Sequence, residues 1–141
     1  MSSTADFPFN RDWRRRNEIL KLHLRTGPPY DALDFNKGYG HFSSLSVETA
    51  EHLLQEQFLD PDEKQNDSPP THVFIAFMRR YPGVTAHGYF IGPDRDDYRV
   101  TIEGIAYHGP ISAEMSEEAK RLFGSADDFD LKGDSLYVWY D

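Results

Sequence analysis

Apolar residues gather in three runs between His72 and Gly109, and clusters of Pro, Gly and Asp separate the runs. The first run, Val73–Met78, is apolar on both alternating faces, which is typical of a strand that is covered on both sides. The second and third runs are rich in Tyr, Phe, Val and Ile, and turn residues bound each of them. The pattern therefore predicts a three-stranded antiparallel meander over residues 72–108.

The register of this meander decides which side chains face the interior. Pairing Ile91 with Tyr98 across the second turn places His87 and Tyr89 on the same apolar face as Ile102. A shift of one residue would move all of these side chains to the opposite face. The environment predicted for His87 therefore depends on this register.

Helical spacing of apolar residues is found on both sides of the meander. The segment 46–59 begins with a Ser46 cap, and the segment 112–124 begins with a Ser112 cap. A third helix is expected over residues 10–25, because Arg, Lys, Glu and Leu favour helices. Alternation in its last third would also suit a strand, and helix is the preferred interpretation.

The final alternation, Leu136, Val138 and Tyr140, predicts a C-terminal strand that joins the sheet. We expect a single α+β domain over residues 1–141, because the strands cluster together rather than alternate with helices. Its antiparallel sheet, the meander plus the C-terminal strand, would pack with two or three helices. Phe77 and Ile102 are expected to be buried, and Leu54 is expected to be the helix residue that meets the sheet.

Charge is unevenly distributed along this acidic chain, whose formal net charge is −9. Residues 1–25 hold six Arg or Lys against three Asp or Glu, so the remainder carries −12. We expect the basic N-terminal helix to dock on the acidic body, and binding of the Arg11–Arg16 cluster to a partner is the alternative. Nucleic acid is disfavoured as a partner, because the acidic body would repel phosphate.

Several classes of protein are disfavoured by what the sequence lacks. It has no cysteine, no apolar run near ~20 residues and no apolar core of a signal peptide, so we expect a cytoplasmic protein without membrane contact. Its six histidines show no metal-ligand spacing, and no P-loop, dinucleotide fingerprint or serine elbow occurs. No metal site and no cofactor are predicted.

A polar site is nevertheless conceivable beside the sheet. An imidazole in apolar surroundings, with a glycine next to it, is a candidate for ligand binding. Loops positioned by a rigid sheet often carry function, and two such loops are expected, over residues 36–42 and 60–71. The candidate site residues, drawn from the sheet and both loops, are His87, Tyr89, Asn66, Asp67, Tyr39 and His41.

Two classes of function are compatible with the sequence. The preferred one is a non-enzymatic protein-interaction module, because an enzyme of this length would usually show a spaced catalytic constellation. Its partner would be another protein, or a second copy bound through the C-terminal strand. The alternative is a small enzyme or ligand-binding domain with a pocket between the sheet and the 36–42 and 60–71 loops.

Overall fold

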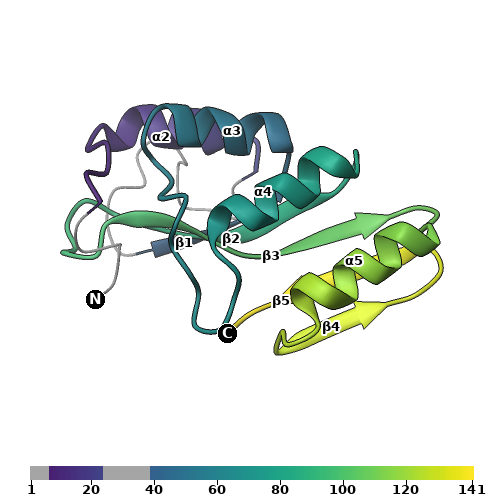
Figure 1. Ribbon diagram of the computed structural model, residues 1–141. Helices are drawn as coiled ribbons and strands as arrows, with labels where there is room; N and C mark the ends of the chain where they lie inside the picture. Colours follow the sequence, from purple (N-terminus) through teal and green to yellow (C-terminus); the bar gives the residue numbers. More distant parts are fainter. Residues whose placement is uncertain (1–6, 24–38) are drawn as a thin grey trace.

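A computed structural model describes residues 7–23 and 39–141 of the chain, and within them it shows an α+β domain (Figure 1). All neighbouring strands pair antiparallel in one five-stranded sheet, in the order β1-β2-β3-β5-β4. The strands are β1 (Tyr39–Leu45), β2 (Thr85–Ile91), β3 (Arg99–His108), β4 (Asp128–Leu131) and β5 (Ser135–Trp139). The helices are α2 (Trp13–Leu20), α3 (Val47–Gln55), α4 (Thr71–Arg80) and α5 (Ala113–Phe123). The predicted fold class is confirmed.

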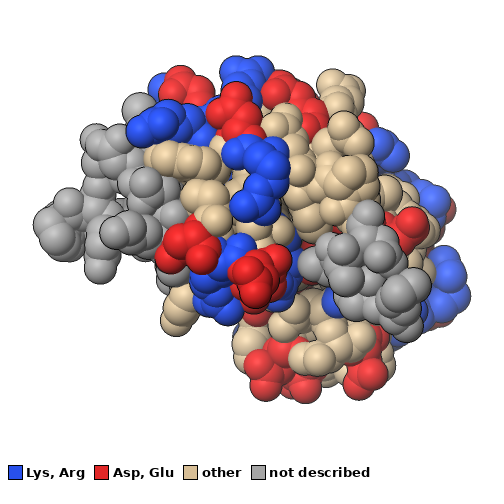
Figure 2. Space-filling model, turned by 90° about the vertical axis from the view of Figure 1, so that its left-hand side faces the viewer, with Lys and Arg blue, Asp and Glu red and all other residues tan. Residues whose placement is uncertain are grey.

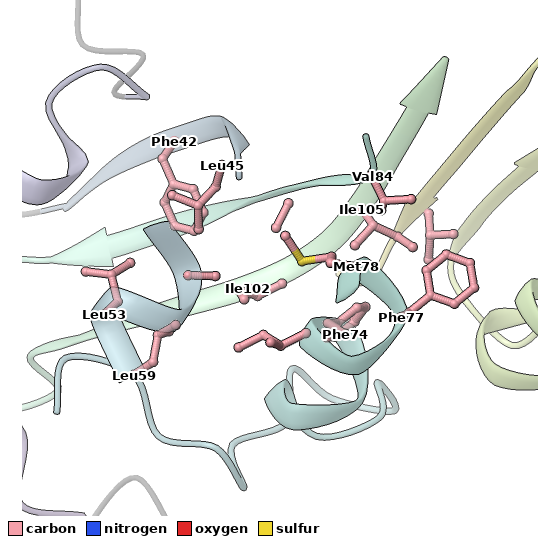
Figure 3. Packing of buried hydrophobic residues seen from close by; sticks show 14 of the residues in the cluster. Phe42, Leu45, Leu53, Leu59, Phe74, Phe77, Met78, Val84, Ile102 and Ile105 are labelled. Carbon is pink, nitrogen blue, oxygen red and sulfur yellow. The ribbon is translucent and has the colours of Figure 1, made fainter. Parts of the chain in front are cut away.

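The hydrophobic core lies between the helices and one face of the sheet, which we name the core face. Figure 3 shows Phe42, Ile102 and Ile105 of the sheet in one cluster with Phe74 and Phe77 of α4. Helix α5 joins the same layer, because Phe123 stacks on Phe74 with ring centroids 5.3 Å apart. The predicted burial of Phe77 and Ile102 is confirmed, with exposures of 1% and 2%.

The first predicted strand of the meander is wrong, because Thr71–Arg80 forms helix α4. Its buried residues Phe74, Ile75 and Met78 follow a helical period, whereas His72 and Ala76 are exposed. A strand would have placed His72, Phe74 and Ala76 on one face. Pro70 begins the helix as its N-cap residue, and a proline before the first turn is compatible with helix formation.

Two strands replace segments that the sequence pattern leaves irregular. Tyr39–Leu45 forms the edge strand β1, so the part of the 36–42 loop that the structure describes is a strand, and residues 36–38 lie outside the described ranges. The short acidic segment Asp128–Leu131 forms the other edge strand, β4. The predicted C-terminal strand is confirmed as β5, but β3 and β4 pair with it on both sides. It therefore has no free edge with which to bind a second copy.

The register between β2 and β3 differs by one residue from the predicted one. Ile91 pairs with Arg99 rather than with Tyr98, and a bulge follows at His87 and Gly88. Phe90 and Val100 consequently face the core, as does Gly88 with its partner Ile102. The side chains of His87 and Tyr89 therefore lie on the opposite face of the sheet.

The predicted caps of two helices are present, and Leu54, the helix residue predicted to meet the sheet, packs against the core cluster without being fully buried. Ser46 and Ser112 each accept a hydrogen bond from a backbone N–H in the first turn of α3 and α5. Leu54 is only partly buried, whereas its neighbour Leu53 is fully buried. Adjacent residues of a helix lie about 100° apart around its axis, so Leu53 and Leu54 do not face the core equally.

Helix α2 is shorter than the predicted segment 10–25, of which residues 24 and 25 lie outside the described ranges. It contacts α3 through Arg15, whose guanidinium lies 2.8 Å from the Glu56 carboxylate. Arg16 is fully buried rather than solvated, and burial lowers its pKa to about 10. Its guanidinium lies over the rings of Phe90 and Tyr98 and donates to the Ile91 carbonyl at 2.9 Å.

Candidate functional site

The face of the sheet opposite the core face, which we name the second face, carries most of the candidate residues. No helix among the described residues packs on it, and several of its side chains are partly or largely exposed. Tyr39 is 58% exposed and Tyr137 is 40% exposed. The second face presents mainly Tyr39, His41, His87, Tyr89, Arg99, Thr101, Tyr137 and Trp139.

The segment between α3 and α4 covers one end of the second face. Figure 1 shows this segment descending past the sheet to the C-terminal residue and returning to α4. Asn66, at its far end, donates from its side chain to the Asp141 carbonyl. Glu63 of the same segment accepts a 2.8 Å hydrogen bond from Thr101, which is only 1% exposed. This end of the second face is therefore closed by the chain itself.

A partly buried polar network, which we name the Arg99 cluster, forms beneath this segment. It consists of Glu63, Gln65, Tyr89, Asp97, Arg99 and Thr101. Arg99 donates to Thr101 at 3.0 Å and to the Tyr89 hydroxyl at 2.6 Å, and it lies 3.1 Å from the Glu63 carboxylate. Burial lowers the pKa of Arg99, but the hydrogen bond to Tyr89 and the charges of Glu63 and Asp97 outweigh burial, so the pKa is raised.

Glu63 is the unusual member of the Arg99 cluster. Burial raises its pKa to about 7, and the hydrogen bond from Thr101 and the charge of Arg99 only partly oppose this effect. Its Oε1 atom is buried without a hydrogen-bond partner among the described residues. With this pKa, the protonation state of Glu63 changes near neutral pH while the protein is folded.

A cavity of about 750 Å³ adjoins the Arg99 cluster, between the 60–71 segment, the β2–β3 turn and the residues before α2. Its lining residues include Phe9, Arg11, Glu63, Asn66, Asp97 and Arg99. Figure 2 shows acidic and basic residues side by side on the end of the molecule that carries the β2–β3 turn. The described part of that end thus presents no patch of a single charge sign.

The open end of the second face contains a hollow of about 470 Å³, which we name the β3 trough. Its lining includes His41, His87, Glu103, Ala106, Tyr137 and Trp139. The rings of His87 and Tyr137 stack across β3 with centroids 5.0 Å apart and planes inclined by 9°. Aromatic surface from β2 and β5 thus borders small side chains on the central strand.

Gly104 allows this arrangement, because His87 lies directly over it. A Cβ atom at position 104 would stand 2.7 Å from His87 Nε2 and 1.8 Å from the Val138 carbonyl oxygen. The glycine pairs with both His87 and Trp139, so it joins the two sides of the trough. Only a residue without a side chain permits both contacts.

Replacing Gly104 by alanine should therefore separate β3 from β5. We expect a loss of about 1–3 kcal/mol in the free energy of unfolding, since the new methyl group overlaps backbone. Urea denaturation followed by circular dichroism measures this loss. Gly133→Ala is the control, because nothing lies within 4 Å of a Cβ there. Equal stability of the two variants would show that β3 and β5 do not approach as described.

The β3 trough is electrostatically suited to a cation. Glu103 is the acidic residue of the described lining, which contains no Asp, Lys or Arg and also includes the imidazoles of His41, His87 and His108. Burial raises the pKa of Glu103, as does the charge of Asp141, and a hydrogen bond with the Trp139 side chain lowers it. Asp128 and Asp130 of β4 pair with Trp139 and Tyr137 and extend the acidic character to the sheet edge. Lys132 lies 3.6 Å from Asp130 and offsets part of this charge.

Five of the six candidate residues are divided among three hollows. His87 and His41 line the β3 trough, and Asn66 lines the cavity beside the Arg99 cluster. Tyr39, Tyr89 and again His41 line a smaller hollow of about 270 Å³, which shares Asp97 and Arg99 with the large cavity. Asp67 is exposed and lines none of these three hollows. His87 and Asn66 thus do not form the single site that the sequence suggested.

Sequence reasoning missed the polar partners that organise this face. Arg99, Thr101 and Glu103 alternate with apolar residues in the sequence, which indicates a polar face but neither its contacts nor the bulge at Glu103. Tyr137 and Trp139 alternate with buried Leu136 and Val138, and this was the available signal for the trough. Nothing in the sequence around Glu63 distinguishes it from the other acidic residues of its segment.

Comparison with known proteins adds no relative: no family model, no curated protein and no solved structure matches the chain. No group of three or more His, Asp or Glu that could hold a metal ion occurs within residues 7–23 and 39–141. Across those same ranges, each helix is too short or too polar to cross a bilayer. The geometry of the second face is therefore what indicates a function.

Proposed function

We propose that the protein is a non-enzymatic interaction module that binds another protein through the open end of its second face. The observation that carries this proposal is the exposure of aromatic side chains there. Tyr137 projects from a rigid sheet at 40% exposure, beside the partly buried Trp139. Tyr39, which is 58% exposed, extends the aromatic surface of the second face at the other end of the sheet, where its pairing partner is Ile91. Aromatic residues on a fixed scaffold bury much area at little entropic cost, and they are enriched at protein interfaces.

A positively charged protein is the partner that fits this surface. The chain carries a net charge of −9, and Glu103, Asp128 and Asp130 lie on or beside the open end of the second face. Lys132, which follows β4, is already close to Asp130. Charge complementarity of this kind accelerates association and disfavours acidic partners.

One observation favours the alternative of a small enzyme or ligand-binding domain. The cavity of about 750 Å³ is large enough for a small molecule, and Glu63 beneath it has a pKa near that of a general acid or base. The carboxylate, however, already accepts from Thr101 and lies against Arg99, and its remaining oxygen is buried. A small molecule retained by the purified protein in native mass spectrometry would favour this alternative.

A comparison of captured proteins tests the interaction proposal. Lysate would be passed over the immobilised wild type, over a Tyr39→Ser/Tyr137→Ser double variant and over a Leu22→Ser control, which changes an 87% exposed leucine elsewhere. We expect at least one basic protein whose retention falls about tenfold for the double variant alone, which corresponds to about 1.4 kcal/mol. Direct titration of that protein would follow. Identical retention profiles for all three would contradict the proposal.

A further inference from the structure

We infer that the β3 trough is a pocket for a single arginine side chain presented by a basic partner. This inference rests on the proposed function, because it assigns the chemistry by which the second face recognises its partner. The trough has three features that suit a guanidinium: a carboxylate, flat ring surfaces and enough volume for the side chain.

The carboxylate is that of Glu103. It lies at the bulge between β2 and β3, where the strand carries one extra residue and pairing passes from Ile102 to Gly104. A bulge redirects the side chain of the extra residue, and Glu103 lines the trough rather than projecting freely into solvent. It is half-buried and no described Lys or Arg lines the trough with it, so a cation that enters meets no competing Lys or Arg side chain there.

The ring surfaces come from the strands on either side of β3. His87 and Tyr137 stack on each other across this strand, and Trp139 pairs with Gly104 beside them. The Trp139 side chain is hydrogen-bonded to the Glu103 carboxyl, so an indole ring adjoins the negative charge. A cation over an aromatic face gains electrostatic energy from the ring, most of all from indole.

The shape favours arginine over lysine. A guanidinium is planar, stacks on rings and can bind a carboxylate with two parallel hydrogen bonds, whereas an ammonium is compact and strongly hydrated. The trough volume of about 470 Å³ admits the whole side chain. The adjoining acidic positions of β4, Asp128 and Asp130, suit further basic residues on the same partner segment.

Three peptides with blocked ends test the assignment, each with one central residue in a Gly-Ser background: arginine, citrulline or lysine. Citrulline has nearly the shape of arginine without its charge. Fluorescence of Trp139, in a Trp13→Phe background that removes the other indole, reports binding in the trough. We expect the arginine peptide to bind at least about tenfold more tightly than the citrulline peptide, and more tightly than the lysine peptide.

Glu103→Gln should remove most of the preference for arginine over citrulline, whereas Glu117→Gln, at an exposed position of α5, should retain it. Circular dichroism verifies that each variant is folded, and the citrulline comparison needs no variant in the trough. Equal affinity for arginine and citrulline, tighter binding of lysine, or no fluorescence change with any peptide would each overturn the inference.

The outcomes also separate this inference from the proposed function. If a partner protein depends on Tyr39 and Tyr137 while the peptides show no preference for arginine, the second face binds proteins by other contacts. If arginine is preferred but no captured protein depends on the two tyrosines, the trough binds a free cationic ligand. Each result removes one claim and leaves the other standing.

Discussion

Phe74→Ala should lower the free energy of unfolding by about 3–5 kcal/mol, because it removes a buried ring from the centre of the core. Phe74 is 1% exposed, stacks on Phe123 of α5 at 5.3 Å and meets Tyr140 edge-on at 6.1 Å. The change therefore loosens α4, α5 and the end of the chain together. Thermal denaturation should show a midpoint lower by roughly 10 °C.

His72→Ala is the matched control, because His72 lies on the same helix and is exposed. A strand over this segment would put His72 and Phe74 on one face, so both substitutions would have comparable effects. Helix α4 instead predicts a large effect at position 74 and a change within about 0.5 kcal/mol at position 72. Similar losses at both positions would contradict the helix.

Glu63→Gln should make the protein more stable at pH 8 and should change its stability little at pH 4.5. The pKa of Glu63 is raised from 4.5 to about 7, so the folded state holds this proton more tightly than the unfolded state. The stability that protonated Glu63 contributes is fully present below the pKa of this group in the unfolded state. It is lost as the pH rises through the pKa of the group in the folded state. Between pH 4.5 and pH 8, the titration of Glu63 therefore lowers the free energy of unfolding of the wild type by about 3 kcal/mol.

Urea denaturation at several pH values between these limits measures the difference between wild type and variant. The difference should grow with pH and level off above about pH 7. Glu117→Gln, an exposed substitution on α5, should show no such growth. A difference at Glu63 that stays constant with pH would show that the carboxyl is not buried in the protonated form.

Local sequence signals correctly predicted those helices and strands whose apolar residues and caps match the burial seen in the structure. Ser46 and Ser112 cap their helices, and the alternation of Leu136 and Val138 gives β5. The segment Thr71–Arg80 misled because a helix buried along a wide face and a strand buried on both faces are equally apolar. The helix is favoured over the strand because Phe74 and Phe77 both contact Phe123 of α5, which lies far along the chain.

The candidate site was predictable only in part, because its geometry depends on strand register. The predicted pairing of Ile91 with Tyr98 placed His87 in the core, and the observed pairing with Arg99 places it on the second face. Strand β1 contains Gly40, Ser43 and Ser44 among its seven residues, so its pairing follows from β2 rather than from its own sequence. The role of Glu63 arises from tertiary contacts alone.

The central claim, that the open end of the second face is the binding surface, is tested most directly by nuclear magnetic resonance. The isotopically labelled protein would be titrated with the arginine peptide while backbone amides and the indole N–H groups are followed. We predict shifts confined to β2, β3 and β5 around His87, Gly104 and Trp139, with the Trp139 indole among the largest. Shifts centred on the helices, or on the cavity beside Arg99, would contradict the claim.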